Sequence, residues 1–179
     1  MRFDPEENGI GPEYITLQVN LRMFLDNLNP LPKWEARLNK NDSCEAWKWS
    51  EELRYGKELY EQWRQVFTMV MAFAENLPEE KDEVLSTKDM IYQNAYLIAP
   101  KIISASGDTL YQIKMENAAL IRLNCRQMME QIGFAVLMDK ADERHQQVIK
   151  DELGKVRLHF RQWVATFKKD EYEDEWGLF

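Results

Sequence analysis

The pair Asp142 and His145 is the only place in this sequence where residue types and spacing approach a metal-binding motif. Di-iron bundles need Glu-x-x-His pairs and further carboxylates on facing helices, because the metals take oxygen and imidazole ligands that converge in the core. The sequence contains only two histidines. An acidic residue at a helix start ordinarily caps the helix or interacts with its dipole. We therefore interpret Asp142 as a helix-start residue and predict no metal site and no other cofactor.

Motifs for catalysis are also missing from the sequence. It has no Gly-rich phosphate loop, no nucleophile elbow and no Cys-x-x-Cys pair. Neither histidine has an arginine at the offset that would place both groups on one phosphate, as a helical ribonuclease requires. His159 follows Lys155 by one helical turn and is predicted to lie at the surface or at the rim of the core. We predict that the protein is not an enzyme and has no catalytic residues.

A cluster of basic residues lies in the last predicted helix. Residues 140–169 carry eight Lys or Arg residues and four Asp or Glu residues. Lys150, Arg157 and Arg161, with Lys168, are available for an outer face of that helix. Three interpretations stay open: a solvated charged face, a contact for phosphate or another anionic partner, and a surface onto which an acidic tail folds back.

The C-terminal residues 170–179 combine negative charge with large apolar side chains. They carry five carboxylates and no basic residue, interleaved with Tyr172, Trp176, Leu178 and Phe179. Carboxylates alone would make a solubilising end, whereas aromatic residues among them indicate docking, in cis or onto a neighbouring molecule. We predict that this tail is an interaction element and that Tyr172, Trp176 and Phe179 take part in it.

Composition limits the function classes further. The net charge of −8 argues against a generic nucleic-acid binder, because phosphate contacts need clustered Lys and Arg. Cys44 and Cys125 provide no disulfide framework, which favours a reduced, cytoplasmic setting. The first residues have no apolar signal-peptide core, and no apolar run approaches membrane-spanning length. We expect a soluble, cytoplasmic protein with no membrane partner.

Helical periodicity organises the whole chain. Alternating Val, Ile and Thr runs are few, while Leu, Met, Glu, Gln, Lys and Ala are abundant, so the sequence predicts an all-helical fold. Apolar residues spaced by three and four define amphipathic segments. These are a short N-terminal helix in residues 12–28, a long helix over 44–77, a helix pair in 87–139 kinked around 100–107, and a final helix after Asp142.

These segments specify an all-α, up-and-down four-helix bundle with an additional N-terminal amphipathic helix. We divide the chain into an N-terminal arm with a short helix and linker (1–42), the four-helix bundle (43–169) and an acidic aromatic tail (170–179). The arm packs either on its own bundle or on that of a neighbour. Both long central segments carry apolar residues beyond a single seam, and faces that wide usually bury against a second subunit or an added arm.

Local signals refine the bundle. Gly56 lies in an apolar seam and predicts a close approach between helices. Gly107 and Asp108 are candidate C-cap and N-cap residues at the break in the kinked pair, and Ser86 or Thr87 is a candidate cap at its start.

Two residue types in the second half of the kinked pair have alternative interpretations. Asn117 and Asn124 flank its apolar stripe, where they are either exposed at the rim or buried to fix register. Its methionines are interpreted as core-filling residues.

Two stretches of the predicted bundle are similar to motifs of a known family. Residues 77–80 (LPEE) end the first long helix with an apolar residue, proline and an acidic run, and residues 98–107 (IAPKIISASG) resemble an apolar-Pro-x-x-Ile-Ala-x-Gly signature near the end of the second helix. Residues 43–169 therefore resemble the four-helix-bundle family of ribosomal-RNA intervening-sequence proteins and retroelement accessory variability proteins. The arm and the tail lie outside this resemblance.

The resemblance implies a ring-shaped homo-oligomer, such as a pentamer, with no catalytic residues. It also implies nucleic-acid binding through a basic surface in some members. We predict a non-enzymatic, homo-oligomeric helical scaffold or interaction protein, with a possible protein partner contacted through the tail. The alternative is an RNA- or DNA-binding bundle that uses Lys150, Arg157 and Arg161 of the last helix.

Overall fold

The structure is a computed structural model that describes residues 30–34, 46–78, 86–171 and 176–177. These residues form four helices and no strand, which confirms the predicted all-α four-helix fold. The predicted N-terminal helix lies outside the described residues. The chain divides into two units, Met1–Pro30 and Leu31–Phe179, and every described helix belongs to the second. The helices are α2 (Ala46–Glu75), α3 (Thr87–Ser106), α4 (Tyr111–Leu137) and α5 (Glu143–Val164).

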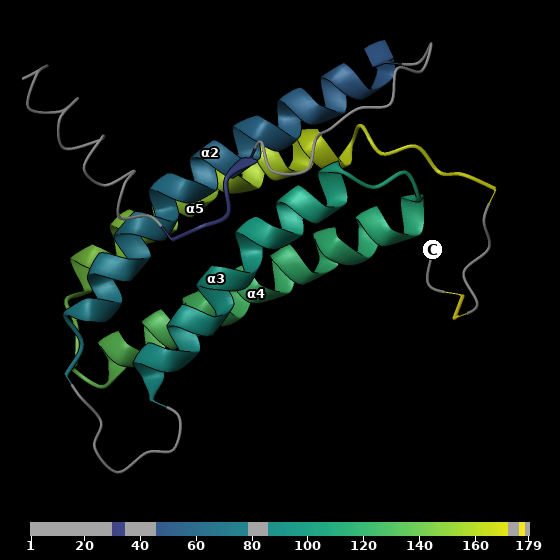
Figure 1. The fold of residues 1–179 in the computed structure, drawn as a ribbon. Coiled ribbons are helices and arrows are strands. Elements are labelled where there is room, and N and C mark those ends of the chain that lie inside the picture. The colour runs from purple at the N-terminus through teal and green to yellow at the C-terminus, as the bar shows by residue number, and fades with distance from the viewer. Residues whose placement is uncertain (1–29, 35–45, 79–85, 172–175, 178–179) are drawn as a thin grey trace, which may run out of the picture. The chain divides into compact units, whose positions relative to one another are not determined.

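The extent of contact differs between the pairs of neighbouring helices in this unit. Helix α2 lies against α3 and α5, α3 lies against α4, and the contact between α4 and α5 is the sparsest of these neighbouring pairs. Figure 1 shows α2 beside α5 and α3 beside α4. The apolar faces of the four helices therefore enclose one core, and the α4–α5 side is packed least tightly.

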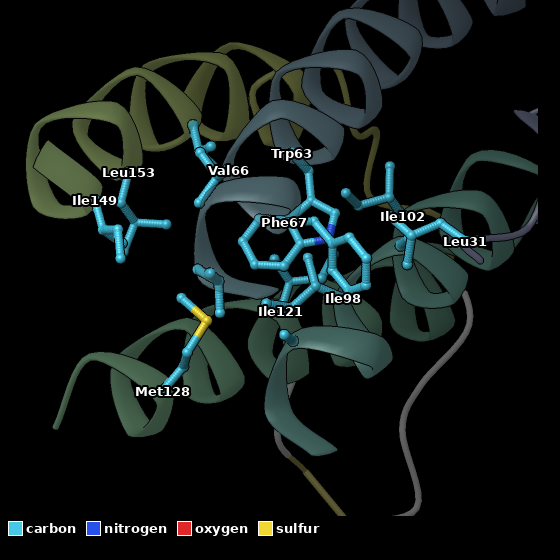
Figure 2. Close-up of a cluster of buried hydrophobic side chains, with 14 of the residues drawn as sticks. Leu31, Trp63, Val66, Phe67, Ile98, Ile102, Ile121, Met128, Ile149 and Leu153 are labelled. Atoms are coloured by element: carbon cyan, nitrogen blue, oxygen red, sulfur yellow. The ribbon is translucent and has the colours of Figure 1, made fainter. Parts of the chain in front are cut away.

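The core is built from the apolar positions that the three-and-four spacing selects. Figure 2 shows Trp63 and Phe67 of α2 facing Ile98 of α3 and Ile121 of α4. Trp63, Ile98 and Ile121 are all fully or almost fully buried, and Phe160 of α5 packs against them while half-buried. Burial of such large side chains supplies the main stabilisation of a fold of this kind.

Helix α3 begins and ends at the predicted signals. Ser86 is its N-cap, and the Ser86 hydroxyl and the Asp89 carboxylate form a reciprocal capping box. Gly107 is its C-cap, and its N–H donates to the carbonyls of Ile103 and Ser104 at 3.1 and 3.2 Å. Pro100 lies inside α3, and the helix continues beyond it to Ser106.

The start of α4 differs from the prediction. Leu110 is the N-cap and has no capping side chain, so the assignment of Asp108 as N-cap is wrong. The Asp108 carboxylate instead accepts a hydrogen bond from the Leu110 N–H at 2.9 Å within the turn. A residue far along the chain completes the cap, because the Asp170 carboxylate accepts from the Tyr111 N–H at 2.9 Å. An anion at this position also interacts favourably with the positive end of the helix dipole.

Gly56 marks a close approach, as predicted. A Cβ atom at this position would lie 2.5 Å from Ser106 Oγ of α3, 3.0 Å from the ring of Trp34 and 3.1 Å from Trp163 Nε1 of α5. Three different parts of the chain therefore meet at this glycine.

The residues that precede the first helix also contact the bundle. Leu31 is buried, the Tyr60 hydroxyl donates to the Pro32 carbonyl, and the rings of Trp34 and Tyr60 lie 5.5 Å apart. Residues 31–34 thus lie against α2 rather than extending from it.

The two asparagines of α4 are buried, which excludes the rim-exposed interpretation. Each side-chain amide donates a hydrogen bond of 2.8 Å to the backbone carbonyl one turn earlier. Asn117 donates to Ile113, and Asn124 donates to Leu120. A third asparagine forms a hydrogen bond between helices, because Asn94 of α3 donates to Gln131 of α4 at 3.1 Å.

Candidate functional site

A groove runs along the loosely packed side of the bundle between α4 and α5. Its volume is about 440 Å³. The buried side chains Ile121, Leu153 and Val156 form its floor, and Cys125 and Met129 are half-buried beside them. The remaining lining residues are Arg122, Arg126, Glu130, Gln146, Lys150, Arg157 and Phe160.

Four cations surround this apolar floor. Arg122 and Arg126 come from α4, and Lys150 and Arg157 come from α5; all four are exposed. The single lining carboxylate, Glu130, lies 3.4 Å from Arg126. The other three cations form no ion pair with a carboxylate that the structure describes. An apolar floor with unneutralised cations at the rim suits a ligand that is both apolar and anionic.

The thiol in the groove floor is not a reactive nucleophile. Burial raises the pKa of Cys125 to about 12, although the nearby charge of Arg157 acts in the opposite direction. The thiolate is the nucleophilic form of cysteine. Cys125 therefore contributes apolar surface to the groove rather than chemistry.

The predicted interaction residues fall into three groups. Lys150 and Arg157 line the groove, whereas Arg161 is exposed on α5 outside it. Trp176 is 85% exposed, and Tyr172 and Phe179 lie outside the described residues. The sequence prediction did not include Arg122 and Arg126, which double the number of cations at the rim.

The metal candidate of the sequence has a structural role instead. The Asp142 carboxylate caps α5 by accepting from the Arg144 N–H at 2.8 Å, and Arg144 Nη2 lies 2.6 Å from the same carboxylate. The hydrogen bonds from Arg144 lower the pKa of Asp142 to about 2. Among the described residues, no group of three or more His, Cys, Asp or Glu side chains is arranged to hold a metal ion.

A buried ion pair crosses the core near the start of α4. Lys114 Nζ lies 2.7 Å from one carboxylate oxygen of Glu52 on α2 and donates to the other at 3.0 Å, and both residues are buried. Burial raises the pKa of Glu52, while the hydrogen bond and the charge of Lys114 partly offset that rise. Lys114 Nζ also lies 5.7 Å from the ring centre of Phe167. The pair is enclosed by the fold and is not open to a ligand.

A second surface feature is a set of exposed apolar side chains on the outer face of α4. At 100° per residue its exposed apolar side chains fall on one side of the helix, away from the core. Leu137 is 78% exposed there. The members of this face, called here the α4 outer face, are Leu120, Leu123, Phe134, Leu137 and Met138.

No protein family model, no curated protein and no solved structure matches this chain. Within the part of the chain that the structure describes, no helix has the length and apolar character needed to cross a membrane.

Proposed function

We propose that the protein is a non-enzymatic helical scaffold that assembles into homo-oligomers through the α4 outer face. The observation that supports this proposal is two clusters of exposed apolar side chains on one side of α4, Leu120 with Leu123 and Phe134 with Leu137 and Met138. Polar residues, Glu130 among them, lie between the two clusters. The stretch from Leu120 to Met138 is about 27 Å long along the helix. Exposed clusters of large apolar side chains can mark an interaction site, because leaving them in water is unfavourable.

A second copy of the chain is the occupant that we propose for this face. Apolar clusters can pack against the same clusters of a second copy around a two-fold axis, or against another patch in a closed ring. The resemblance to the intervening-sequence protein family, which forms rings, favours the latter. A reduced, cytoplasmic setting belongs to the same proposal, since Cys125 carries a free thiol.

Charge placed on the α4 outer face should separate the copies. We expect the double variant Leu123→Glu/Phe134→Glu to convert an oligomer into single chains of 21.4 kDa, measured by native mass spectrometry. Both side chains are exposed in the single chain, so the variant should keep its helical circular dichroism. The control is Leu158→Glu, at an apolar residue of α5 that is more exposed than either, which should leave the assembly intact. An oligomer that withstands the double variant would assign assembly to another surface.

A second candidate function is nucleic-acid binding through the rim of the α4–α5 groove. The observation that favours it is the convergence of Arg122 and Arg126 with Lys150 and Arg157 from the facing helix. Affinity for RNA or DNA would then fall steeply with salt, because each neutralised phosphate releases counterions.

The salt dependence provides the test of this second candidate. Binding of single-stranded RNA and DNA is titrated at several salt concentrations, for the full chain and for a chain ending before residue 170. Reversal of Arg122 and Arg157 to glutamate should reduce both the affinity and the salt slope. If neither length of chain binds in a salt-dependent way, this candidate is excluded.

A further inference from the structure

We propose that the α4–α5 groove binds the acidic, aromatic C-terminal segment of the same chain, residues 171–179. The groove would then be a cis docking site whose occupancy controls access of other anionic ligands to its cationic rim. This inference does not depend on self-association through the α4 outer face.

The chemistry of the groove defines the kind of segment that fits it. The floor is apolar, the rim is cationic, and three of the four rim cations have no described carboxylate partner. A ligand therefore needs apolar side chains for the floor and carboxylates at intervals for the rim. Residues 171–179 supply both, as four carboxylates alternate with Tyr172, Trp176, Leu178 and Phe179.

The position of Asp170 places the segment at one end of the groove. Its carboxylate accepts from the Tyr111 N–H at 2.9 Å, which fixes the chain at the start of α4. At 100° per residue, Tyr111 lies on the same side of α4 as Arg122 and Met129, which line the groove. From this anchor, Ile121 lies about 15 Å along the helix.

Nine residues are long enough to cover that distance and the groove beyond it. An extended chain of this length spans about 30 Å. A segment leaving Asp170 can therefore pass Arg122 and Arg157 and continue toward Lys150. Because the segment is tethered to the groove, its effective concentration there exceeds that of a segment on another molecule at ordinary protein concentrations.

Trp176 provides the apolar driving force for docking. In the structure its side chain is 85% exposed, so nearly all of its surface is available for burial. Aromatic side chains gain most from an apolar cleft, while charge pairing at the rim sets the orientation of the segment.

Zero-length crosslinking measures this docking directly. A carbodiimide joins an amine only to a carboxylate in contact with it, and Lys150 is the amine at the groove rim. The full-length protein is prepared in isotopically heavy and light forms, mixed, crosslinked and analysed by mass spectrometry. We expect peptides that join Lys150 to Glu175, the carboxylate far enough from Asp170 to reach it, within heavy chains or within light chains, and no mixed pairs.

A lysine on the same helix supplies the internal control. Lys155 points away from the groove and pairs with Glu152 at 2.5 Å, so its yield with the segment should be about ten-fold below that of Lys150. Equal yields at both lysines would show unspecific attraction and overturn the proposal. Mixed heavy–light pairs would assign the groove to the segment of a second copy, which also overturns it.

Two variants separate the charge contribution from the apolar contribution. Arg122→Glu/Arg157→Glu should lower the Lys150 yield by about ten-fold, because two exposed charge pairs together amount to roughly that factor. The matched reversal Arg54→Glu/Lys57→Glu on exposed positions of α2 should leave the yield unchanged. Trp176→Ala should lower it several-fold, and an unchanged yield would contradict docking of the indole. Circular dichroism confirms that each variant is folded.

Discussion

The ion pair between Glu52 and Lys114 is the least replaceable polar contact of the core. Both side chains are buried, and Lys114 Nζ lies 2.7 Å from the Glu52 carboxylate. Removing one partner leaves a buried charge without compensation, whereas removing both removes the desolvation cost as well. The pair therefore makes single substitutions costly without necessarily making the fold more stable than an apolar pair would.

A double-mutant cycle tests this interpretation. Glu52→Gln and Lys114→Met should each lower the free energy of unfolding by about 3–5 kcal/mol, because each leaves one buried charge unpaired. The double variant Glu52→Leu/Lys114→Met should recover most of that loss. Urea unfolding followed by circular dichroism provides the free energies. If the two single losses simply add in the double variant, the residues are not coupled.

The same pair predicts a pH dependence of stability. Burial raises the pKa of Glu52 above its usual value of 4.5, so the folded chain holds this proton more tightly than the unfolded chain. The contribution of Glu52 to the free energy of unfolding is therefore largest below pH 4.5 and falls as the pH rises through the raised pKa. Unfolding curves from pH 4 upward should show this decline in the wild type and a flatter profile in the Glu52→Leu/Lys114→Met variant. If the free energy of unfolding depends on pH in the same way in the wild type and the variant, the pKa of Glu52 is not raised.

At the scale of elements, the helical glycines Gly56 and Gly154 have opposite consequences. Gly56 lies where α2, α3 and α5 approach, and Gly154 of α5 has open space around it. Glycine loses more chain entropy than alanine in a helix. Substitution by alanine should therefore raise the free energy of unfolding at Gly154 and lower it at Gly56.

Paired alanine substitutions measure that difference. Gly154→Ala should raise the free energy of unfolding by about 0.5–1 kcal/mol through helix propensity. Gly56→Ala should lower it by about 1–3 kcal/mol, because its Cβ would lie 2.5 Å from Ser106 Oγ and close to two tryptophan rings. Adding Ser106→Ala should recover part of the loss. A stabilising Gly56→Ala would show that the helices are not in close approach there.

The elements themselves were predictable because their signals are local and repeated. Apolar residues at three-and-four spacing select the buried face over many turns, and Ser86 and Gly107 provide cap chemistry within a few residues of the helix ends. The start of α4 was not predictable in this way. Its cap comes from Asp170, fifty-nine residues beyond Tyr111, and no local pattern connects the two.

The candidate site was predictable in part for the same reason. Lys150 and Arg157 belong to a segment with an excess of basic residues, and that excess predicts them as interaction residues. Arg122 and Arg126 belong to a segment, residues 87–139, with five basic and five acidic side chains and hence no charge signal. Only the packing of α4 beside α5 brings the four cations together.

At the scale of the whole molecule, two surfaces carry the proposed function. The α4 outer face would join copies of the chain, and the α4–α5 groove would take an apolar, anionic segment. The two surfaces adjoin on α4, since Arg126 and Glu130 of the groove lie beside the outer face on the helix. An acidic chain with a local cationic groove would favour its own acidic segment over unspecific polyanions.

The central claim is that the chain self-associates, and its mass in solution tests that claim most directly. Native mass spectrometry or light scattering is applied to the full-length protein at micromolar concentration, together with the Leu123→Glu/Phe134→Glu variant. The account predicts a closed assembly of several 21.4 kDa chains for the wild type and single chains for the variant. A wild-type protein that stays at 21.4 kDa throughout this concentration range would contradict it.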